Sequence, residues 1–181
     1  MDRREFEEKQ LDSEYLYKGA VINVRRDRAL LPDGQEAMRE VVEHPGGVGI
    51  ALEDEDGTFF LVEQWRYAQS EVLLEFPAGK KEPGEDPLTT AKREIIEETG
   101  WSGKDYEYLG ELVPTGAYDS ERIAMYYAKK DEYHGQHLDK DEHLNLTKMT
   151  LDELIADIVA GKIPDAKTVA MVFLLKERKK G

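Results

Sequence analysis

The stretch GKKEPGEDPLTTAKREIIEETGW, residues 79–101, predicts a glycine-rich turn followed by a short helix. We expect the helix over Pro87–Thr99, because Asp86 suits an N-cap and proline is favoured at the first helical position. Gly100 then suits the C-terminal stop. One side of this helix is apolar and predicts contact with a core; it carries Leu88, Ala91 and Ile95.

A second side of the same helix is acidic. Glu94 and Glu98 are four residues apart and therefore neighbours, and Glu97 flanks them. Carboxylates this close repel one another unless a cation lies between them or an arginine pairs with one. Mg²⁺ and Mn²⁺ prefer oxygen ligands, so the array predicts a divalent metal site. Arg93 is placed to pair with Glu85 in the preceding turn. The alternative interpretation is an ordinary solvated helix in an acidic protein.

The full stretch resembles the Nudix box. That motif has a glycine, a glutamate after five residues, and after seven more the run Arg-Glu-U-x-Glu-Glu-x-Gly-U, in which U is bulky and apolar. Every specified position is met, with Ile95 and Trp101 in the apolar positions. The resemblance implies an α/β (α+β) fold, an α/β/α sandwich that carries the box as loop–helix–loop on a mixed sheet. It also implies an enzyme that hydrolyses a nucleoside diphosphate linked to another group.

The resemblance assigns roles to the charged residues of the box. Glu94 and Glu98 are implied to be metal ligands, and Glu97 a further ligand or an orienting group. Glu85 and Arg93 are implied to form a structural pair that supports catalysis. The implied cofactor is Mg²⁺, with Mn²⁺ as a substitute.

Composition limits the possible partners and location. The chain has 181 residues and a net charge of −14, from 39 acidic and 25 basic residues. An acidic surface repels nucleic acid and anionic membranes, so we expect neither as a partner. No apolar run approaches the ~20 residues that span a bilayer, and the N-terminus has no apolar signal core. The absence of cysteine excludes disulfides and thiolate metal sites. We expect a cytoplasmic protein.

The pattern outside the box predicts further strands and helices. Residues 1–13 are highly charged and are expected to be frayed or locally helical, and residues 130–146 are expected to be loop, followed by a short strand. Thr150 and Glu153 form a capping-box signature before a helix over Leu151–Val159. Strands are expected at 20–24, 29–31, 38–43, 48–53, 59–65, 72–76, 106–113 and 123–128, and a last helix at about 165–179.

Residues 15–178 resemble the ADP-ribose pyrophosphatase branch of the Nudix superfamily. The resemblance rests on LLPDGQEAMREVVEHPGGVGIAL, LVEQWRYA, LLEFPAGK and the tail KIPDAKTVAMVFLL. It implies an additional N-terminal antiparallel β element, residues 1–43, before a Nudix hydrolase domain at residues 44–181. That element is implied to be exchanged between two subunits of a homodimer and to help form the adenine pocket.

The branch resemblance also implies site residues outside the box. Ala78 is implied to offer its backbone carbonyl to the metal, and Arg66 to contact the diphosphate or the terminal ribose. Glu40 and Tyr17 are candidates for the nucleotide side of the site, against ordinary roles on a solvated strand and in packing. Glu121 is the candidate general base, with Asp119 as the alternative.

The predicted function is Mg²⁺-dependent hydrolysis of the pyrophosphate bond of ADP-ribose to AMP and ribose 5-phosphate, or of the same bond in a closely related nucleoside diphosphate sugar. One alternative is a Nudix hydrolase of another small nucleotide, such as GDP-mannose, a dinucleoside polyphosphate or NADH. A less favoured alternative is a non-catalytic module that senses ADP-ribose.

Overall fold

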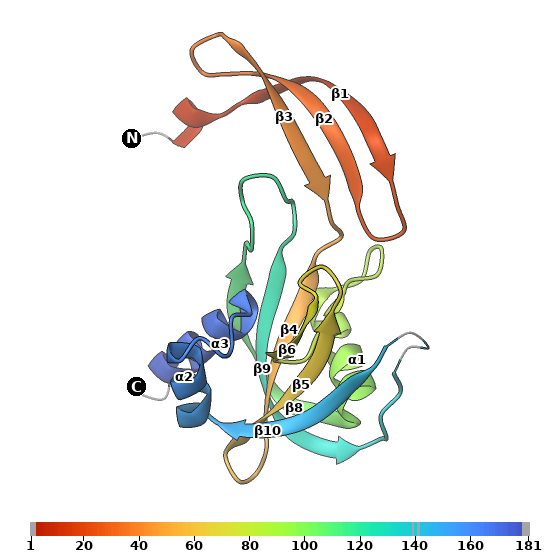
Figure 1. Ribbon diagram of the computed structural model, residues 1–181, viewed down its shortest axis with the longest axis vertical. Helices are drawn as coiled ribbons and strands as arrows, with labels where there is room; N and C mark the ends of the chain where they lie inside the picture. The colour runs from red at the N-terminus through yellow and green to blue at the C-terminus, as the bar shows by residue number, and fades with distance from the viewer. Residues whose placement is uncertain (1–2, 139, 141, 179–181) are drawn as a thin grey trace. The chain divides into compact units, whose positions relative to one another are not determined.

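The computed structural model describes residues 3–138, 140 and 142–178, which form two compact units (Figure 1). The first unit comprises the chain up to Gly46 together with the segment Val113–Glu121. The second comprises Gly47–Leu112 and the chain from Arg122 onward. The sequence predicts a single boundary, between residues 43 and 44. It does not predict that Val113–Glu121 groups with the N-terminal strands, where Asp119 pairs with Val42.

The first unit is a three-stranded antiparallel sheet in the order β1-β2-β3, preceded by a 3₁₀ turn, η1 (Arg3–Phe6). Its strands are β1 (Lys9–Lys18), β2 (Asn23–Leu30) and β3 (Glu36–Glu43). The expectation of frayed or helical structure is wrong for residues 9–13, which lie in β1, and β2 is continuous through its charged segment. Cross-strand ion pairs explain both, since Arg26 bonds Glu14 and Arg28 bonds Asp12, each at 2.7 Å.

The second unit is built on a seven-stranded mixed sheet. Five strands follow the order β10-β5-β4-β9-β8, while β6 pairs with β5 and β7 with β4. The β4–β9 pairing is parallel and the others are antiparallel. The strands are β4 (Gly47–Glu53), β5 (Thr58–Arg66), β6 (Glu71–Glu75), β7 (Ala78–Lys80), β8 (Trp101–Leu112), β9 (Ile123–Tyr133) and β10 (Leu144–Thr150).

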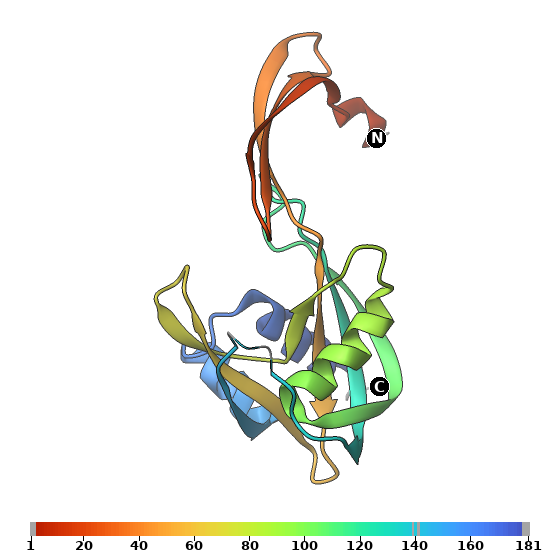
Figure 2. The same ribbon diagram turned by 90° about the vertical axis from the view of Figure 1, so that its right-hand side faces the viewer.

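Helices cover both faces of this sheet, as Figures 1 and 2 show. Helix α1 (Pro87–Thr99) lies on one face, and α2 (Leu151–Val159) and α3 (Ala166–Arg178) lie on the other. Successive side chains of β5 point to opposite faces of the sheet, so this strand contributes to both cores. Phe59 and Leu61 pack in the cluster under α2 and α3, whereas Phe60 packs in the cluster under α1. The expected α/β/α sandwich with a mixed sheet, and a separate antiparallel element before it, is confirmed.

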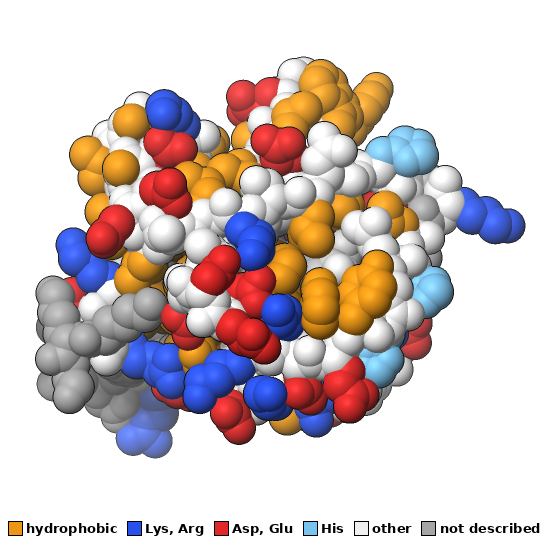
Figure 3. Space-filling model, turned by 90° about the horizontal axis from the view of Figure 1, so that it is seen from below, with side chains coloured by type: hydrophobic (Ala, Val, Ile, Leu, Met, Phe, Trp, Pro, Cys, Tyr) orange, Lys and Arg blue, Asp and Glu red, His pale blue; other side chains and the backbone are white. Residues whose placement is uncertain are grey.

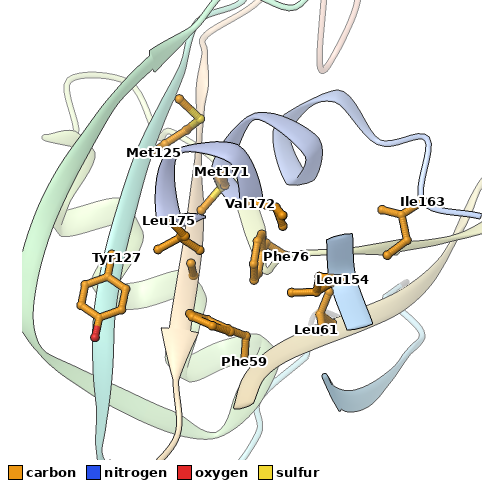
Figure 4. Close-up of a cluster of buried hydrophobic side chains, with 11 residues drawn as sticks. Phe59, Leu61, Phe76, Met125, Tyr127, Leu154, Ile163, Met171, Val172 and Leu175 are labelled. Atoms are coloured by element: carbon orange, nitrogen blue, oxygen red, sulfur yellow. The ribbon is translucent and has the colours of Figure 1, made fainter. Parts of the chain in front are cut away.

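The core under α3 is densely apolar. Figure 4 shows Met171 and Leu175 of α3 directed toward Phe59 and Phe76. Each fully buried side chain of this size contributes about 1.5–3 kcal/mol of transfer free energy. This packing holds α3 against β5 and against the segment between β6 and β7 that leads into residues 79–101.

Helix ends follow the sequence signals closely. The Asp86 side chain accepts bonds from the N–H groups of Leu88 and Thr89, and Gly100 takes the left-handed conformation with φ +77°. Thr150 and Glu153 form the expected capping box of α2. The predicted end of the last helix, Lys179, lies outside the described residues.

Two strands are longer than expected. β8 begins at Trp101 instead of Tyr106, and β9 runs to Tyr133 instead of Ala128. Polar residues 129–133 remain in the sheet because β9 pairs with β8 along its length, and Lys104 bonds Asp131 across the pair at 3.0 Å.

Acidic and basic side chains are intermixed on the face of the molecule in Figure 3, with apolar side chains between them. Ion pairs account for part of such mixing in the second unit, where Lys130 and Lys148 both bond Asp54. None of the helices among residues 3–138, 140 and 142–178 is long and apolar enough to cross a bilayer.

Candidate active site

Arg93 organises the acidic side of α1. Its guanidinium bonds Glu94 at 2.8 Å, Glu97 at 2.9 Å and Glu85 at 3.1 Å. The hydrogen bond from Arg93 is the largest cause that lowers the pKa of Glu85, to about 2. One arginine thus fixes the preceding turn against the helix and orients two of its carboxylates.

Glu98 is the most buried of the box carboxylates, at 2% exposed. One of its oxygens accepts a 3.0 Å bond from the N–H of Ala78. Burial, followed by repulsion from the carboxylates of Glu142 and Glu94, raises the pKa of Glu98 to about 8. The contact brings Ala78 to the box helix through its N–H, while metal binding by its carbonyl stays a prediction.

Gly79 leaves room for the Glu94 carboxyl group. A Cβ atom added at Gly79 would overlap the carboxyl atoms of Glu94. Burial also raises the pKa of Glu94, against the charge and hydrogen bond of Arg93. The close approach of strand β7 to α1 explains why the stretch opens with glycine: any side chain would displace this carboxylate.

Glu142 is a further acid at this site, and sequence reasoning missed it. Its negative charge contributes to the raised pKa of both Glu94 and Glu98, and its side chain accepts a 3.2 Å bond from Gln64. Glu142 follows β9 in a segment expected to be loop, and no spacing in the sequence relates it to the box. Only the tertiary structure of the second unit brings Glu142 near α1, so the sequence pattern gives no sign of it.

The segment after β9 is tied to the C-terminal end of α1. The backbone N–H of His134 bonds the Gly100 carbonyl at 2.7 Å, and that of His137 bonds the Glu97 carbonyl at 3.0 Å. The Gln136 side chain donates to the Glu98 carbonyl at 2.6 Å. These bonds satisfy carbonyl groups that a helix end leaves unpaired, and they direct the chain back toward the acidic side of α1.

Arg66, the last residue of β5, is the remaining member of this group of residues. Its Nε and Nη2 atoms bond the two oxygens of Glu75 at 2.6 and 2.7 Å. Its positive charge also interacts with Glu98. The predicted substrate contact Arg66 thus belongs to the same unit as the box and is partly exposed.

The other predicted site residues belong to the first unit, and their roles stay predictions. Tyr17 and Glu40 are exposed on β1 and β3. The carboxylate of Glu121 lies 3.4 Å from the imidazole of His44, and its backbone N–H bonds Asp119 at 2.9 Å.

The donor set fits a hard divalent cation. Among the residues that the structure describes, no three acidic or histidine side chains already form a metal site. Mg²⁺, however, usually takes one or two carboxylates and completes its shell with water and phosphate oxygens. Glu94 and Glu98 are partly desolvated, and the charges of these residues and of Glu142 repel one another. A cation bound there would offset both the desolvation of the carboxylates and their mutual repulsion.

Comparison with known families decides the identity of the fold. Residues 43–171 match the model of the NUDIX domain. This chain belongs to the Nudix family. It is a Nudix hydrolase, and residues 8–42 match the nucleoside diphosphate sugar hydrolase N-terminal domain. Enzymes of this family act on small nucleotides and generally use divalent metal ions.

Individual relatives cover nearly the whole Nudix chain. The methanol dehydrogenase activator of Bacillus methanolicus is 38% identical over 173 residues, 94% of each chain. The ADP-ribose pyrophosphatase of Bacillus subtilis (strain 168) is 30% identical over 175 residues, 96% of this chain and 95% of the relative. The crystal structure of an ADP compounds hydrolase shares the fold with a TM-score of 0.83 at 21% identity, covering 97% and 95% of the two chains.

Proposed function

We propose that this Nudix hydrolase cleaves the diphosphate bond of ADP-ribose with Mg²⁺ as cofactor, and releases AMP and ribose 5-phosphate. The observation that carries the proposal is the buried Glu98 carboxylate beside Glu94 and Glu142, an arrangement suited to a cation and a phosphate-bearing substrate. The name of the Bacillus subtilis relative and the N-terminal domain match support a nucleoside diphosphate sugar as substrate.

The box residues would hold the metal and keep its ligands in place. Glu94 and Glu98 would coordinate it, with Glu97 and the Ala78 carbonyl as further oxygen donors. Bound divalent cations neutralise charge on the diphosphate and acidify the attacking water. Arg93 orients Glu94 and Glu97 through its hydrogen bonds, and Glu85 anchors Arg93. Arg66 would bind the diphosphate or the terminal ribose as a fixed cation.

Three acidic residues are candidates for the role of general base. Glu142 lies in the same unit as Glu94 and Glu98, close enough for its charge to act on both. Glu121 is the base that the sequence predicts, with Asp119 as its alternative. Because Glu142 is held by Gln64 beside the ligand carboxylates, we favour it as the group that takes the proton from the attacking water.

A substrate panel tests the proposed reaction. ADP-ribose, GDP-mannose, NADH, FAD and a diadenosine polyphosphate are each incubated with the chain, with Mg²⁺ and with EDTA, and products are separated by chromatography. We expect the highest kcat/KM for ADP-ribose, equal amounts of AMP and ribose 5-phosphate, and no turnover in EDTA. A higher kcat/KM for another compound would replace the substrate, and ADP-ribose binding without any turnover would favour the sensing module.

Activation of a dehydrogenase is a second candidate function. The relative that is 38% identical over 94% of both chains is named an activator of methanol dehydrogenase. If this chain acts in the same way, addition of catalytic amounts raises the turnover rate of a methanol dehydrogenase, and Glu98→Gln removes the effect. An unchanged dehydrogenase rate with active hydrolase excludes this candidate for the dehydrogenase used.

The first unit is proposed to make a homodimer, with residues 1–43 exchanged between subunits and contributing to the adenine pocket near Tyr17 and Glu40. Every residue of β1 is exposed, including Leu11 and Leu16, which are close to half exposed. A three-stranded sheet needs an apolar face covered to be stable, and a second copy of the chain supplies that cover.

Light scattering after size-exclusion chromatography measures the oligomeric state. We expect twice the chain mass of 20.7 kDa for the wild type and for Gln10→Glu, which adds charge at a polar position of β1. Leu16→Glu adds the same charge at an apolar position and is expected to shift the protein to monomer. A wild-type mass of one chain at micromolar concentration would refute the dimer.

A further inference from the structure

An ionic cluster lies at the start of α3, and we define it as Arg66, Glu75, Asp165 and Lys167. Of these residues only Arg66 has a part in the reaction described so far. Glu75 and Lys167 are only 1% and 6% exposed. The Lys167 ammonium bonds Glu75 and lies 3.0 Å from Asp165, while Glu75 also holds Arg66 through two hydrogen bonds. Charges this deeply buried persist only when each has a partner.

The same turn of α3 is hydrogen-bonded to the segment between β6 and β7, which leads into the box. The hydroxyl oxygen of Thr168 accepts a 2.9 Å bond from the N–H of Phe76, two residues before Ala78. Asp165 accepts bonds from the Thr168 N–H at 2.9 Å and from its hydroxyl at 2.6 Å. The four residues Asp165–Thr168 therefore present Lys167 to Glu75 from a fixed support.

The Glu75 carboxylate bonds two cationic side chains, Arg66 and Lys167, and the bond to Lys167 affects how Glu75 holds Arg66. Arg66 uses Nε and Nη2 for the two oxygens of Glu75, which leaves Nη1 for another anion. Lys167 bonds one of the same oxygens and so limits rotation of the carboxylate. Without Lys167, Glu75 would be held by Arg66 alone, and the long Arg66 side chain would gain conformations that point elsewhere.

We propose that Lys167 is a positioning residue of this hydrolase, which holds Glu75 in the orientation that presents Arg66 to the diphosphate of the substrate. The inference rests on the proposed function for the identity of that anion. Lys167 acts through Glu75 and Arg66, so its contribution depends on Arg66 being present. A purely structural link between α3 and β6 predicts no such dependence.

A double-mutant cycle between Lys167→Met and Arg66→Ala tests this dependence. KM and kcat for ADP-ribose and the Kd for ADP are measured for the wild type, both single variants and the double variant. We expect Lys167→Met to weaken ADP binding and raise KM about tenfold, which corresponds to a loss near 1.4 kcal/mol. In the Arg66→Ala background, Lys167→Met should change either constant less than twofold.

Three further variants control for stability and charge. Lys162→Met removes an exposed lysine that bonds Asp157 at 2.8 Å, and it should leave both constants unchanged. Lys167→Arg keeps the charge and should recover most of the ADP affinity. Lys167→Gln serves if the methionine variant does not fold, with the same expected dependence on Arg66. The melting temperature of each variant reports the structural effect separately.

The outcomes separate this inference from the proposed reaction. If Lys167→Met and Lys167→Gln weaken ADP binding equally with and without Arg66, or leave it unchanged, Lys167 has no positioning role. If the wild type binds ADP but does not hydrolyse ADP-ribose, the proposed reaction fails while the binding cycle still decides the role of Lys167.

Discussion

Glu98→Gln is expected to lower the rate of hydrolysis strongly and at the same time stabilise the metal-free protein. The unfolded chain ionises this carboxyl group near its ordinary pKa of 4.5, whereas burial and two neighbouring carboxylates raise the pKa in the folded chain to about 8. Between these pH values the folded state binds more protons, so the stability of the wild type falls as pH rises. Glutamine carries no charge, and its side-chain oxygen can still accept the bond from Ala78.

The gain should appear as a higher free energy of unfolding in EDTA at pH 8, by about 1–4 kcal/mol. The difference between variant and wild type should shrink as pH falls toward 5. With Mg²⁺ the order reverses, because the cation stabilises only the ionised wild type. The loss of kcat/KM should be about 10³-fold, since the variant removes a proposed ligand of the cation that would stabilise charge in the transition state.

A matched control keeps this prediction specific. Glu63→Gln removes a carboxylate at an exposed position of β5 and should change neither stability nor turnover by more than a small factor. Near wild-type turnover of Glu98→Gln with Mg²⁺, or a lower stability than the wild type in EDTA at pH 8, would contradict the proposed role of Glu98 as a buried ligand carboxylate.

The box helix is the part of the fold that sequence predicts best, because its signals are local. Asp86, Pro87 and Gly100 act on backbone groups within one turn of themselves, so their effect needs no tertiary context. The same holds for the capping box at Thr150. Strand β1 lacks such signals: its charged residues become a strand only because arginines on β2 pair with them, and those partners are 12–16 residues away.

The candidate site shows the same contrast between local and distant determinants. The spacing of Glu94, Glu97 and Glu98 follows from helix geometry, and their contacts with Arg93 are local. Glu142 comes from a polar loop 44 residues after Glu98. Tertiary contacts hold this loop near Glu98, among them the bonds of residues 134–137 to the end of α1 and the bond from Gln64 to Glu142. Lys167 lies in the tail KIPDAKTVAMVFLL, which resembles the ADP-ribose pyrophosphatase branch. The sequence does not predict its contact with Glu75, because the two residues are 92 positions apart.

Glu142→Gln is expected to lower kcat for ADP-ribose by about 10²–10⁴-fold with a small change in KM, the range typical of a lost general base. Glutamine keeps the size of the side chain and its bond to Gln64 but cannot take the proton from water. Glu121→Gln, measured in parallel, should keep most of the wild-type kcat. Circular dichroism and melting temperatures check that both variants fold.

The comparison of Glu142 with Glu121 is decisive because the two acids differ in what surrounds them. Glu142 acts electrostatically on both Glu94 and Glu98, whereas Glu121 lies 3.4 Å from His44 in the first unit. Gln64→Ala removes the donor that holds Glu142 and should lower kcat by a smaller factor than Glu142→Gln, with no further loss in the double variant. A large loss of kcat in Glu121→Gln, with Glu142→Gln active, would instead assign the base to the segment Val113–Glu121. The pair at Gln64 and Glu142 would then serve to hold the end of the loop.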